Sequence, residues 1–247
     1  MAETARQWEE PWEWDISNVV TEDETPVDNM FSEKQQQLLV TSLYDSWHDQ
    51  QFLALANVGL FYQRDTPPVV PDVMLSLDVT APPELFEKQH RSYFTFVYGK
   101  PPDLVVEVVS NDDGHEERKI DTYAEIGVPY YVIYDPERHL SSRTLRGYVK
   151  NARKYVELAD PLSLPDFPLR LALWTGIYSG FGPVPWLRWA TRDGVLLPTG
   201  AEQADQERQR TNQERVRADQ ERVRADQERQ RADRLAAKLR ELGVEEN

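Results

Sequence analysis

The chain has 247 residues, of which 40% are hydrophobic, so it can form one mid-sized domain with an appendage. It contains no cysteine, which excludes disulfides, thiolate nucleophiles and Cys-based zinc sites and fits a reducing cytoplasm. The formal net charge is −15, and residues 1–200 carry −14 of it. Such an acidic domain is a poor generic binder of phosphate backbones, which counts against a nucleic-acid partner.

Residues 1–30 form an acidic arm that carries Trp8, Trp12 and Trp14. The arm has neither the basic segment nor the apolar run of a secretory signal. No stretch of the chain approaches the about 18 consecutive apolar residues that a membrane-spanning helix needs. We therefore expect a cytoplasmic protein that does not enter a membrane. The arm either packs its aromatic faces on the domain or serves as a docking element.

Residues 31–200 alternate between helical and strand-like patterns. Residues 103–110 are apolar on both faces, which is typical of a central strand covered on both sides. In chain order we predict a helix over 32–48, then a strand, a Gly-containing turn and a second strand within 52–63, and a strand over 69–79. An aromatic loop over 80–100, the strand over 103–110, a helix ending near Ile126, a strand over 128–136, and two shorter strands over 143–149 and 153–158 follow. A Pro- and Trp-rich segment then completes the domain to about residue 200.

Residues 201–247 repeat a seven-residue charged unit, in which Ala218, Ala225 and Ala232 recur. Glu and Arg lie three residues apart in successive units, so they can pair along one helix. If these alanines are the first core position of a coiled coil, glutamates occupy the second, which makes a poor seam until the Leu stripe near the end. Two interpretations stay open: an extended, solvated, charged helix, or a weak coiled coil that joins two chains into a homodimer.

Glu107 is a carboxylate inside the apolar run of 103–110, between Val105 and Val109 on its strand face. Burying an unpaired carboxylate costs several kcal/mol, on the order of 3–5. The chain can protonate Glu107, pair it with a protein cation such as an Arg, or pair it with a metal ion. A second carboxylate, Asp72, opens an earlier strand just after Pro71.

Two carboxylates that converge at one end of neighbouring strands suit an octahedral Mg²⁺ ion that keeps several waters. Lys119, about two turns into the helix that follows Glu107, has a side chain long enough to reach back to the sheet. Two further acids are weaker candidates: Asp103, at the start of the Glu107 strand, and Glu33, on the first helix.

The run PPDLVVEVVSNDDGHEERKIDTYAEIGVPYYVIYDPE resembles the Uma-two group of bacterial restriction-endonuclease-like proteins, part of the PD-(D/E)XK nuclease superfamily. The resemblance also covers NMFSEKQQQLLVTSLYDSW, NVGLFYQ, VVPDVMLS and WLRWATRDGVLLPTG, and so nearly all of the chain. It implies an α/β (α+β) nuclease-like domain over 31–200, with a mixed central sheet flanked by helices. The charged helix of 201–247 follows this domain.

The resemblance also implies site residues. Asp72 matches the aspartate of the PD motif, and Glu107 matches the acid of (D/E)XK. The superfamily lysine would fall at Val109, so this chain departs from the pattern there. The group instead has a lysine in the next helix, four residues before a tyrosine, and Lys119 and Tyr123 fit that spacing, with Tyr123 expected to serve in packing.

The implied catalytic residues are Asp72, Glu107 and Lys119. The implied metal ligands are Asp72, Glu107 and the carbonyl of Val108, with Mg²⁺ as the ion and Mn²⁺ as a substitute. The implied function is a Mg²⁺-dependent endonuclease that hydrolyses phosphodiester bonds of DNA.

Two alternatives stay open: a nuclease-fold scaffold that binds partners through its tail, which the acidic charge favours, and a nuclease for RNA or a small nucleotide. An enzyme needs a basic rim around Asp72, for which Lys88, Arg91, Lys100 and Arg118 are candidates.

Overall fold

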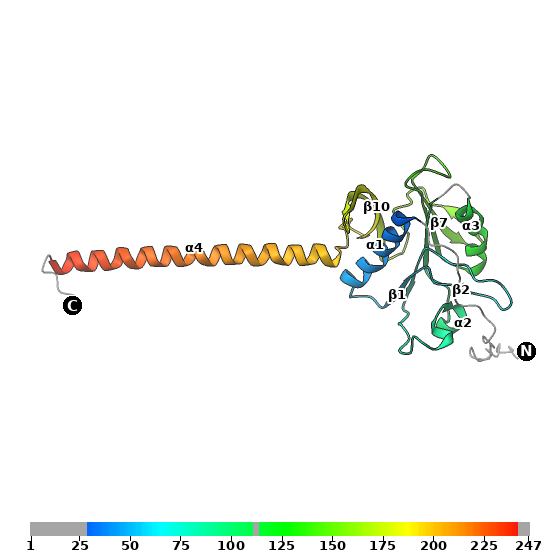
Figure 1. Ribbon diagram of the computed structural model, residues 1–247, viewed down its shortest axis with the longest axis horizontal. Helices are drawn as coiled ribbons and strands as arrows, with labels where there is room; N and C mark the ends of the chain where they lie inside the picture. Colours follow the sequence, from blue (N-terminus) through cyan, green and yellow to red (C-terminus); the bar gives the residue numbers. More distant parts are fainter. Residues whose placement is uncertain (1–28, 111–113, 242–247) are drawn as a thin grey trace, which may run out of the picture. The chain divides into compact units, whose positions relative to one another are not determined.

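The computed structural model describes residues 29–110 and 114–241 (Figure 1). The arm predicted over residues 1–30 therefore lies outside the described residues, except for its last two positions. The chain divides into two compact units, Met1–Thr199 and Gly200–Asn247. Among the described residues, no helix combines the length and the apolar character needed to cross a membrane.

The first unit is built on a six-stranded mixed sheet. Its strand order is β1 (Phe52–Ala56), β3 (Val73–Leu77), β5 (Leu104–Val108), β6 (Tyr130–Tyr134), β7 (Leu145–Asn151) and β8 (Lys154–Glu157). β5 and β6 run parallel and the other neighbours antiparallel, so the predicted mixed sheet is confirmed. All five residues of β5 are buried, as its two-sided apolar pattern predicts.

Two helices cover opposite faces of this sheet (Figure 1). α1 (Met30–Ser46) packs Leu39 and Leu43 against Val106 and Val108 of β5. α3 (His115–Ile126) covers the other face, where its Tyr123 lies in a separate buried cluster with residues such as Val105. Successive strand residues point to opposite faces. Glu107 therefore faces α3, and its neighbours in sequence face α1.

A hairpin that the sequence analysis did not predict lies within the Pro- and Trp-rich segment. β9 (Leu169–Tyr178) pairs antiparallel with β10 (Phe181–Thr191). Its buried part packs on α1, where the Gln35 amide exchanges two hydrogen bonds with the backbone of Leu187, at 2.8 and 2.9 Å. Pro183 and Pro185 lie in β10. Proline demotes a sequence as a strand candidate because it cannot donate to the ladder, which explains the missed prediction.

Shorter elements complete the first unit. The aromatic loop of residues 80–100 holds the 3-10 helix η2 (Lys88–His90), strand β4 (Tyr93–Phe94) and the one-turn helix α2 (Thr95–Tyr98). β4 pairs in parallel with β2 (Leu60–Phe61). Leu60 and Tyr93 of this small sheet lie in the buried cluster that also contains Tyr123.

The second unit is α4 (Gly200–Glu241), a continuous helix of 42 residues. The charged helix predicted within residues 201–247 is therefore confirmed as far as Glu241, the last residue that the structure describes. Residues 204–235 are all exposed. A solvated helix whose exposed residues are mostly polar is stabilised by pairs of charges along its length, or by a partner.

Buried tyrosines give the first unit a pH dependence that can be measured. Burial raises the pKa of Tyr93 to about 12, although the Ser76 hydroxyl donates a hydrogen bond to it at 2.9 Å. Burial also raises the pKa of Tyr131 and Tyr134. Above pH 10 the unfolded chain loses these protons while the folded chain keeps them, so the folded state binds more protons.

We therefore expect the contribution of these tyrosines to the free energy of unfolding to be complete below pH 10. The free energy of unfolding should fall as the pH rises from about 10 towards 12. Ultraviolet absorbance of tyrosinate and far-ultraviolet circular dichroism, followed together, measure this. The buried tyrosines should ionise only as the fold is lost, and Tyr93→Phe should flatten the slope. Complete tyrosine ionisation in a protein that keeps its circular dichroism would contradict the prediction.

Candidate active site

Asp72 and Glu107 lie opposite each other across two strands. β3 and β5 pair antiparallel with Val73 opposite Val106, and the same register carried one residue further places Asp72 opposite Glu107. Side chains of directly opposed residues lie on the same face of a sheet. Both carboxylates therefore belong to the face that α3 covers.

Glu107 is 1% exposed and its two oxygens receive different donors. The Tyr123 hydroxyl donates to Oε1 at 2.6 Å, and the Lys119 ammonium donates to Oε2 at 2.9 Å. Lys119 and Tyr123 are four residues apart on α3, so they project from the same side of the helix. The buried carboxylate is thus paired with a protein cation and a hydroxyl, not with an Arg.

Lys119 reaches the carboxylate from the helix although the strand position of the superfamily lysine holds valine. Its ammonium group also lies 3.3 Å from the Val70 carbonyl, just before Asp72 in the chain. Tyr123 is fully buried, as a packing residue would be, but its hydroxyl also holds the carboxylate of the site. The expectation that Tyr123 serves in packing is therefore confirmed, and its hydrogen bond to Glu107 is an additional contact.

Asp72 is 8% exposed and binds the backbone of the neighbouring strand. Its Oδ2 accepts a hydrogen bond of 2.6 Å from the N–H of Val108. In a strand, the N–H and the C=O of one residue point to the same side. The Val108 carbonyl is therefore directed to the side of β5 on which Asp72 lies, while the Val108 side chain packs on the α1 face.

The pKa values reflect this burial. Burial raises the pKa of Glu107, and the charge of Lys119 and the hydrogen bond from Tyr123 offset only part of the rise. Burial alone would lower the pKa of Lys119, but the neighbouring carboxylates, above all Glu107, outweigh it and raise that pKa. Negative charge is thus concentrated around one ammonium group, in a setting where a further cation would be stabilised.

The donor atoms at this site fit a magnesium ion. Two carboxylates and a backbone carbonyl are hard oxygen ligands, which Mg²⁺ prefers. Residues 29–110 and 114–241 hold no group of three or more His, Cys, Asp or Glu side chains that could bind a metal. A set of two carboxylates still suits Mg²⁺, which usually keeps several waters and takes ligands from the phosphates of its substrate.

The structure removes the two weaker candidates from the site. Asp103 begins β5, about 13 Å from Glu107 along the strand. It accepts hydrogen bonds from the Lys100 ammonium at 2.5 Å and the Leu77 N–H at 2.7 Å. Glu33 pairs with Lys34 at 3.0 Å on α1, which covers the other face of the sheet. Both acids serve local structure.

The predicted basic rim is also reduced. Lys100 is paired with Asp103 at the far end of β5, and so is not part of a rim around Asp72. Arg91 donates to the Phe86 carbonyl at 3.3 Å, within the loop of residues 80–100. Arg118 is exposed on α3 directly before Lys119, which makes it the rim candidate that adjoins a site residue.

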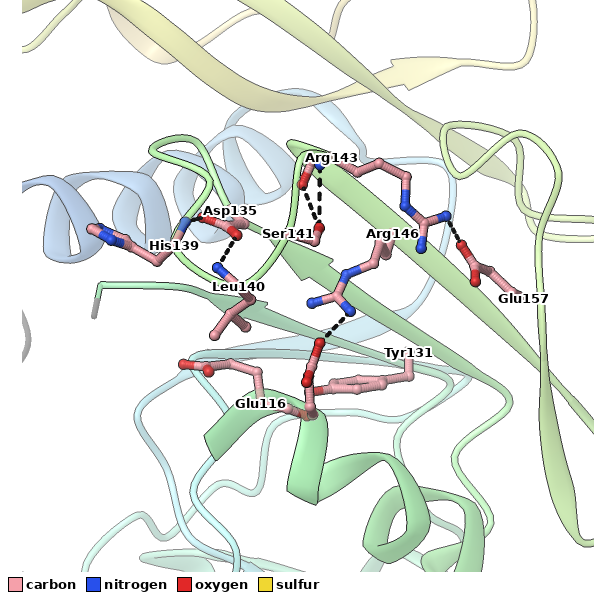
Figure 2. Close-up of polar contacts among 10 residues, drawn as sticks. Glu116, Tyr131, Asp135, His139, Leu140, Ser141, Arg143, Arg146 and Glu157 are labelled. Atoms are coloured by element: carbon pink, nitrogen blue, oxygen red, sulfur yellow. Dashed lines mark hydrogen bonds and ion pairs between the residues drawn. The ribbon is translucent and has the colours of Figure 1, made fainter. Parts of the chain in front are cut away.

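Arg146 is a site neighbour that the sequence pattern did not single out. Ile133 lies opposite Glu107 on one side and Arg146 on the other, so all three share the α3 face. Arg146 is 6% exposed, and its Nη1 donates to Glu117 in the first turn of α3 at 2.6 Å. Figure 2 shows the guanidinium directed from β7 towards the start of the helix. The pair fixes the helix that carries Lys119.

Asp135, just beyond β6, fixes the adjoining loop. Its two oxygens accept hydrogen bonds from the N–H groups of His139 and Leu140, at 2.8 and 2.9 Å (Figure 2).

Within the described part of the chain, Nε and Nη2 of Arg146 have no hydrogen-bond partner. The contact between Arg146 and Glu117 could not be predicted from a single Arg in a strand-like sequence, because the sequence pattern does not identify its partner.

Comparisons with known proteins identify a family and a similar solved structure. The model of a family described as "Uma2: Putative restriction endonuclease" matches residues 3–173, a range that includes every residue of the candidate site. Among solved structures, the chain is similar to "a putative nuclease belonging to DUF820" from Anabaena variabilis ATCC 29413, with 14% identity and a TM-score of 0.41. That match covers 58% of this chain and 75% of the other. The search of curated proteins found no match.

Proposed function

This chain belongs to the Uma2 family, and we propose that it is a Mg²⁺-dependent endonuclease that hydrolyses phosphodiester bonds of DNA. One observation carries the proposal: Asp72 and Glu107 occupy opposed positions on neighbouring strands, and Lys119 contacts Glu107 at 2.9 Å. Carboxylates that can hold an ion, and a cation that can stabilise developing negative charge, are groups that metal-assisted phosphodiester hydrolysis can use.

Asp72, Glu107 and the Val108 carbonyl would hold the ion, and Mn²⁺ would replace Mg²⁺. Held there, the ion would supply Lewis-acid polarisation of the phosphate and activation of a water. Tyr123 holds one oxygen of Glu107 and so limits rotation of the carboxylate. Lys119 places a positive charge beside the site, where it stabilises negative charge that develops on the phosphate.

The acidic charge of the domain favours a second candidate function. Residues 1–200 carry a net charge of −14, and such a surface repels a nucleic-acid backbone at low salt. A nuclease-fold scaffold that acts through α4 would need no such contact. Burial of Glu107 beside Lys119 supports the enzyme, because a scaffold has no need for an ionisable cluster in its core.

Cleavage assays with the purified full chain test the proposal. Plasmid DNA, single-stranded DNA and RNA are incubated with Mg²⁺, with Mn²⁺ and with EDTA, and thermal unfolding is measured under the same conditions. We expect cleavage of DNA that requires either ion, and a midpoint that rises with ion concentration by mass action. Cleavage of RNA alone would change the substrate class. If the protein cleaves none of these substrates, and neither ion changes its unfolding midpoint, the nuclease proposal is wrong and the scaffold function is favoured.

A further inference from the structure

A stripe of uncharged residues runs along α4 at alternating spacings of three and four residues. It consists of Gln206, Gln209, Gln213, Val216, Gln220, Val223, Gln227 and Gln230, here called the Gln/Val stripe. Spacings of three and four place these residues on one side of a helix. All eight are exposed, and Val216 and Val223 are 54% and 55% exposed.

Opposite charges flank the two sides of the Gln/Val stripe. In heptad terms the stripe supplies positions a (Gln) and d (Val or Gln). Position g then holds Asp205, Asn212, Asp219, Asp226 and Asp233, and position e holds Arg210, Arg217, Arg224, Arg231 and Lys238. One flank is therefore acidic except for a single asparagine, and the other is entirely basic. The register differs from the one in which alanines and glutamates form the seam.

We propose that two copies of this chain associate in parallel through the Gln/Val stripe of α4. In a parallel coiled coil, position g of one helix lies beside position e of the other, five residues further along the chain. Asp219 would therefore meet Arg224 of the second copy, and Asp226 would meet Arg231. Every such pair between residues 205 and 238 joins opposite charges, except that of Asn212.

The same charges disfavour the antiparallel arrangement. There, position g faces g and position e faces e, so aspartates would meet aspartates and arginines would meet arginines. Charges at e and g set the orientation of coiled coils in this way. The pattern therefore selects both the partner, a second copy of this chain, and its direction.

The association is weak because glutamine fills most core positions, and polar core residues reduce the stability of a coiled coil. Pairs within the helix also compete, since Arg208 contacts Asp205 and Arg210 lies 3.3 Å from Glu214. Self-association does not depend on the proposed activity. Its use does rest on that activity, because a pair of chains carries two candidate sites, and cutting both strands of a duplex needs two hydrolytic events.

A charge exchange in the full-length protein tests the pairing. One variant carries Asp219→Arg and Asp226→Arg, so that both flanks are basic. The other carries Arg224→Asp and Arg231→Asp, so that basic residues on its e flank become acidic. We expect sedimentation equilibrium to show a concentration-dependent pair for the natural chain. Each variant alone should have a dissociation constant raised at least about tenfold, because attraction becomes repulsion at each exchanged contact.

Mixing the two variants should restore the pair, since every exchanged contact again joins opposite charges. Glu221→Arg with Glu228→Arg is the matched control: it makes the same change of charge at position b, away from the stripe, and should leave the pair intact. A monomeric natural chain at all concentrations, or a mixture that stays dissociated, would overturn the proposal. Loss of cleavage with the pair intact would count against the proposed function alone.

Orientation has its own test, because the chain contains no cysteine. Gln230→Cys places one thiol at a d position, where a parallel, in-register pair brings two copies of residue 230 together. Oxidation should then crosslink two chains in high yield, while the same change at position b, Glu228→Cys, should not. No crosslink from Gln230→Cys, or equal yields from both positions, would refute the parallel register.

Discussion

The Glu107→Gln protein should lose metal-dependent DNA cleavage down to the rate without metal, the largest effect on activity that we expect from one substitution. The change preserves the size of a side chain that is 1% exposed and removes the charge that would bind Mg²⁺. Ions should raise the free energy of unfolding of the natural protein by mass action, by about 2.7 kcal/mol at a hundredfold excess over the dissociation constant, and so raise its unfolding midpoint. The same ions should change the unfolding midpoint of the Glu107→Gln protein very little.

Glu84→Gln is the matched control, because it makes the same chemical change at an exposed position in the loop of residues 80–100. It should cleave at the natural rate and respond to Mg²⁺ as the natural protein does. A Glu107→Gln protein that keeps metal-dependent cleavage would show that the ion binds without this carboxylate. The proposed site would then be wrong, even if the enzyme is a nuclease.

The stability of the same variant depends on pH in a defined direction. Burial raises the pKa of Glu107 above its ordinary value of 4.5, so the folded state binds a proton more tightly than the unfolded state does. The stability that this proton contributes is present below pH 4.5 and is lost as the pH rises through the folded pKa. Glutamine has no such proton, and Glu107→Gln should therefore gain stability relative to the natural protein over that range.

The sequence predicted the strands that carry the site because their patterns are local. The run around Glu107 is apolar on both faces, and the structure shows it as the fully buried β5. Asp72 follows Pro71 at the start of an alternating strand, and in the structure it lies directly before β3, whose register with β5 places it opposite Glu107. Lys119 lies about one turn into α3, which begins at His115, and its long side chain spans the separation to Glu107.

Contacts set by tertiary packing could not be read in this way. Helical spacing places Tyr123 on the inner side of α3 but does not show that its hydroxyl meets Glu107. Arg146 meets Glu117 only because β7 pairs beside β6, an order that no local pattern contains. The β9–β10 hairpin was missed because Pro183 and Pro185 contradict the usual composition of a strand.

Asp72 and Glu107 are both ordered by contacts within the first unit. Each acid is held by donors from its own fold: Asp72 by the Val108 N–H and Glu107 by Lys119 and Tyr123. The cluster is therefore formed before any ligand binds. In the nuclease proposed above, the charge of the substrate would be met by the ion and by Lys119, since Lys100 and Arg91 of the predicted basic rim lie elsewhere. The affinity for a nucleic acid should accordingly depend only weakly on salt concentration, because few protein cations would contact phosphates.

Replacing Lys119 by methionine should produce the largest loss of stability among the substitutions considered. The change removes the cation of a buried pair and leaves Glu107 in a site that is almost inaccessible to water. Breaking such a pair from one side costs about 3–5 kcal/mol, and we expect the lower end at pH 7 because Lys119 keeps 28% of its side chain exposed. Urea unfolding measures the difference, and Lys154→Met, on the exposed side of β8, serves as the control.

A double-mutant cycle separates this electrostatic cost from lost packing. In the Glu107→Gln background no carboxylate remains to be stranded, so Lys119→Met should cost less than about 1 kcal/mol, and the two substitutions should be strongly non-additive. Lower pH provides the second test. Without Lys119 the pKa of Glu107 rises further, so the penalty should be largest above that pKa and should shrink as the pH falls towards 4.5 and the carboxyl takes up its proton. The contradicting result would be a loss of stability from Lys119→Met that is the same at pH 4 as at pH 7 and the same in both backgrounds. The 2.9 Å contact would then contribute packing and no charge pairing, and an electrostatic role of Lys119 towards a phosphate would lose its support.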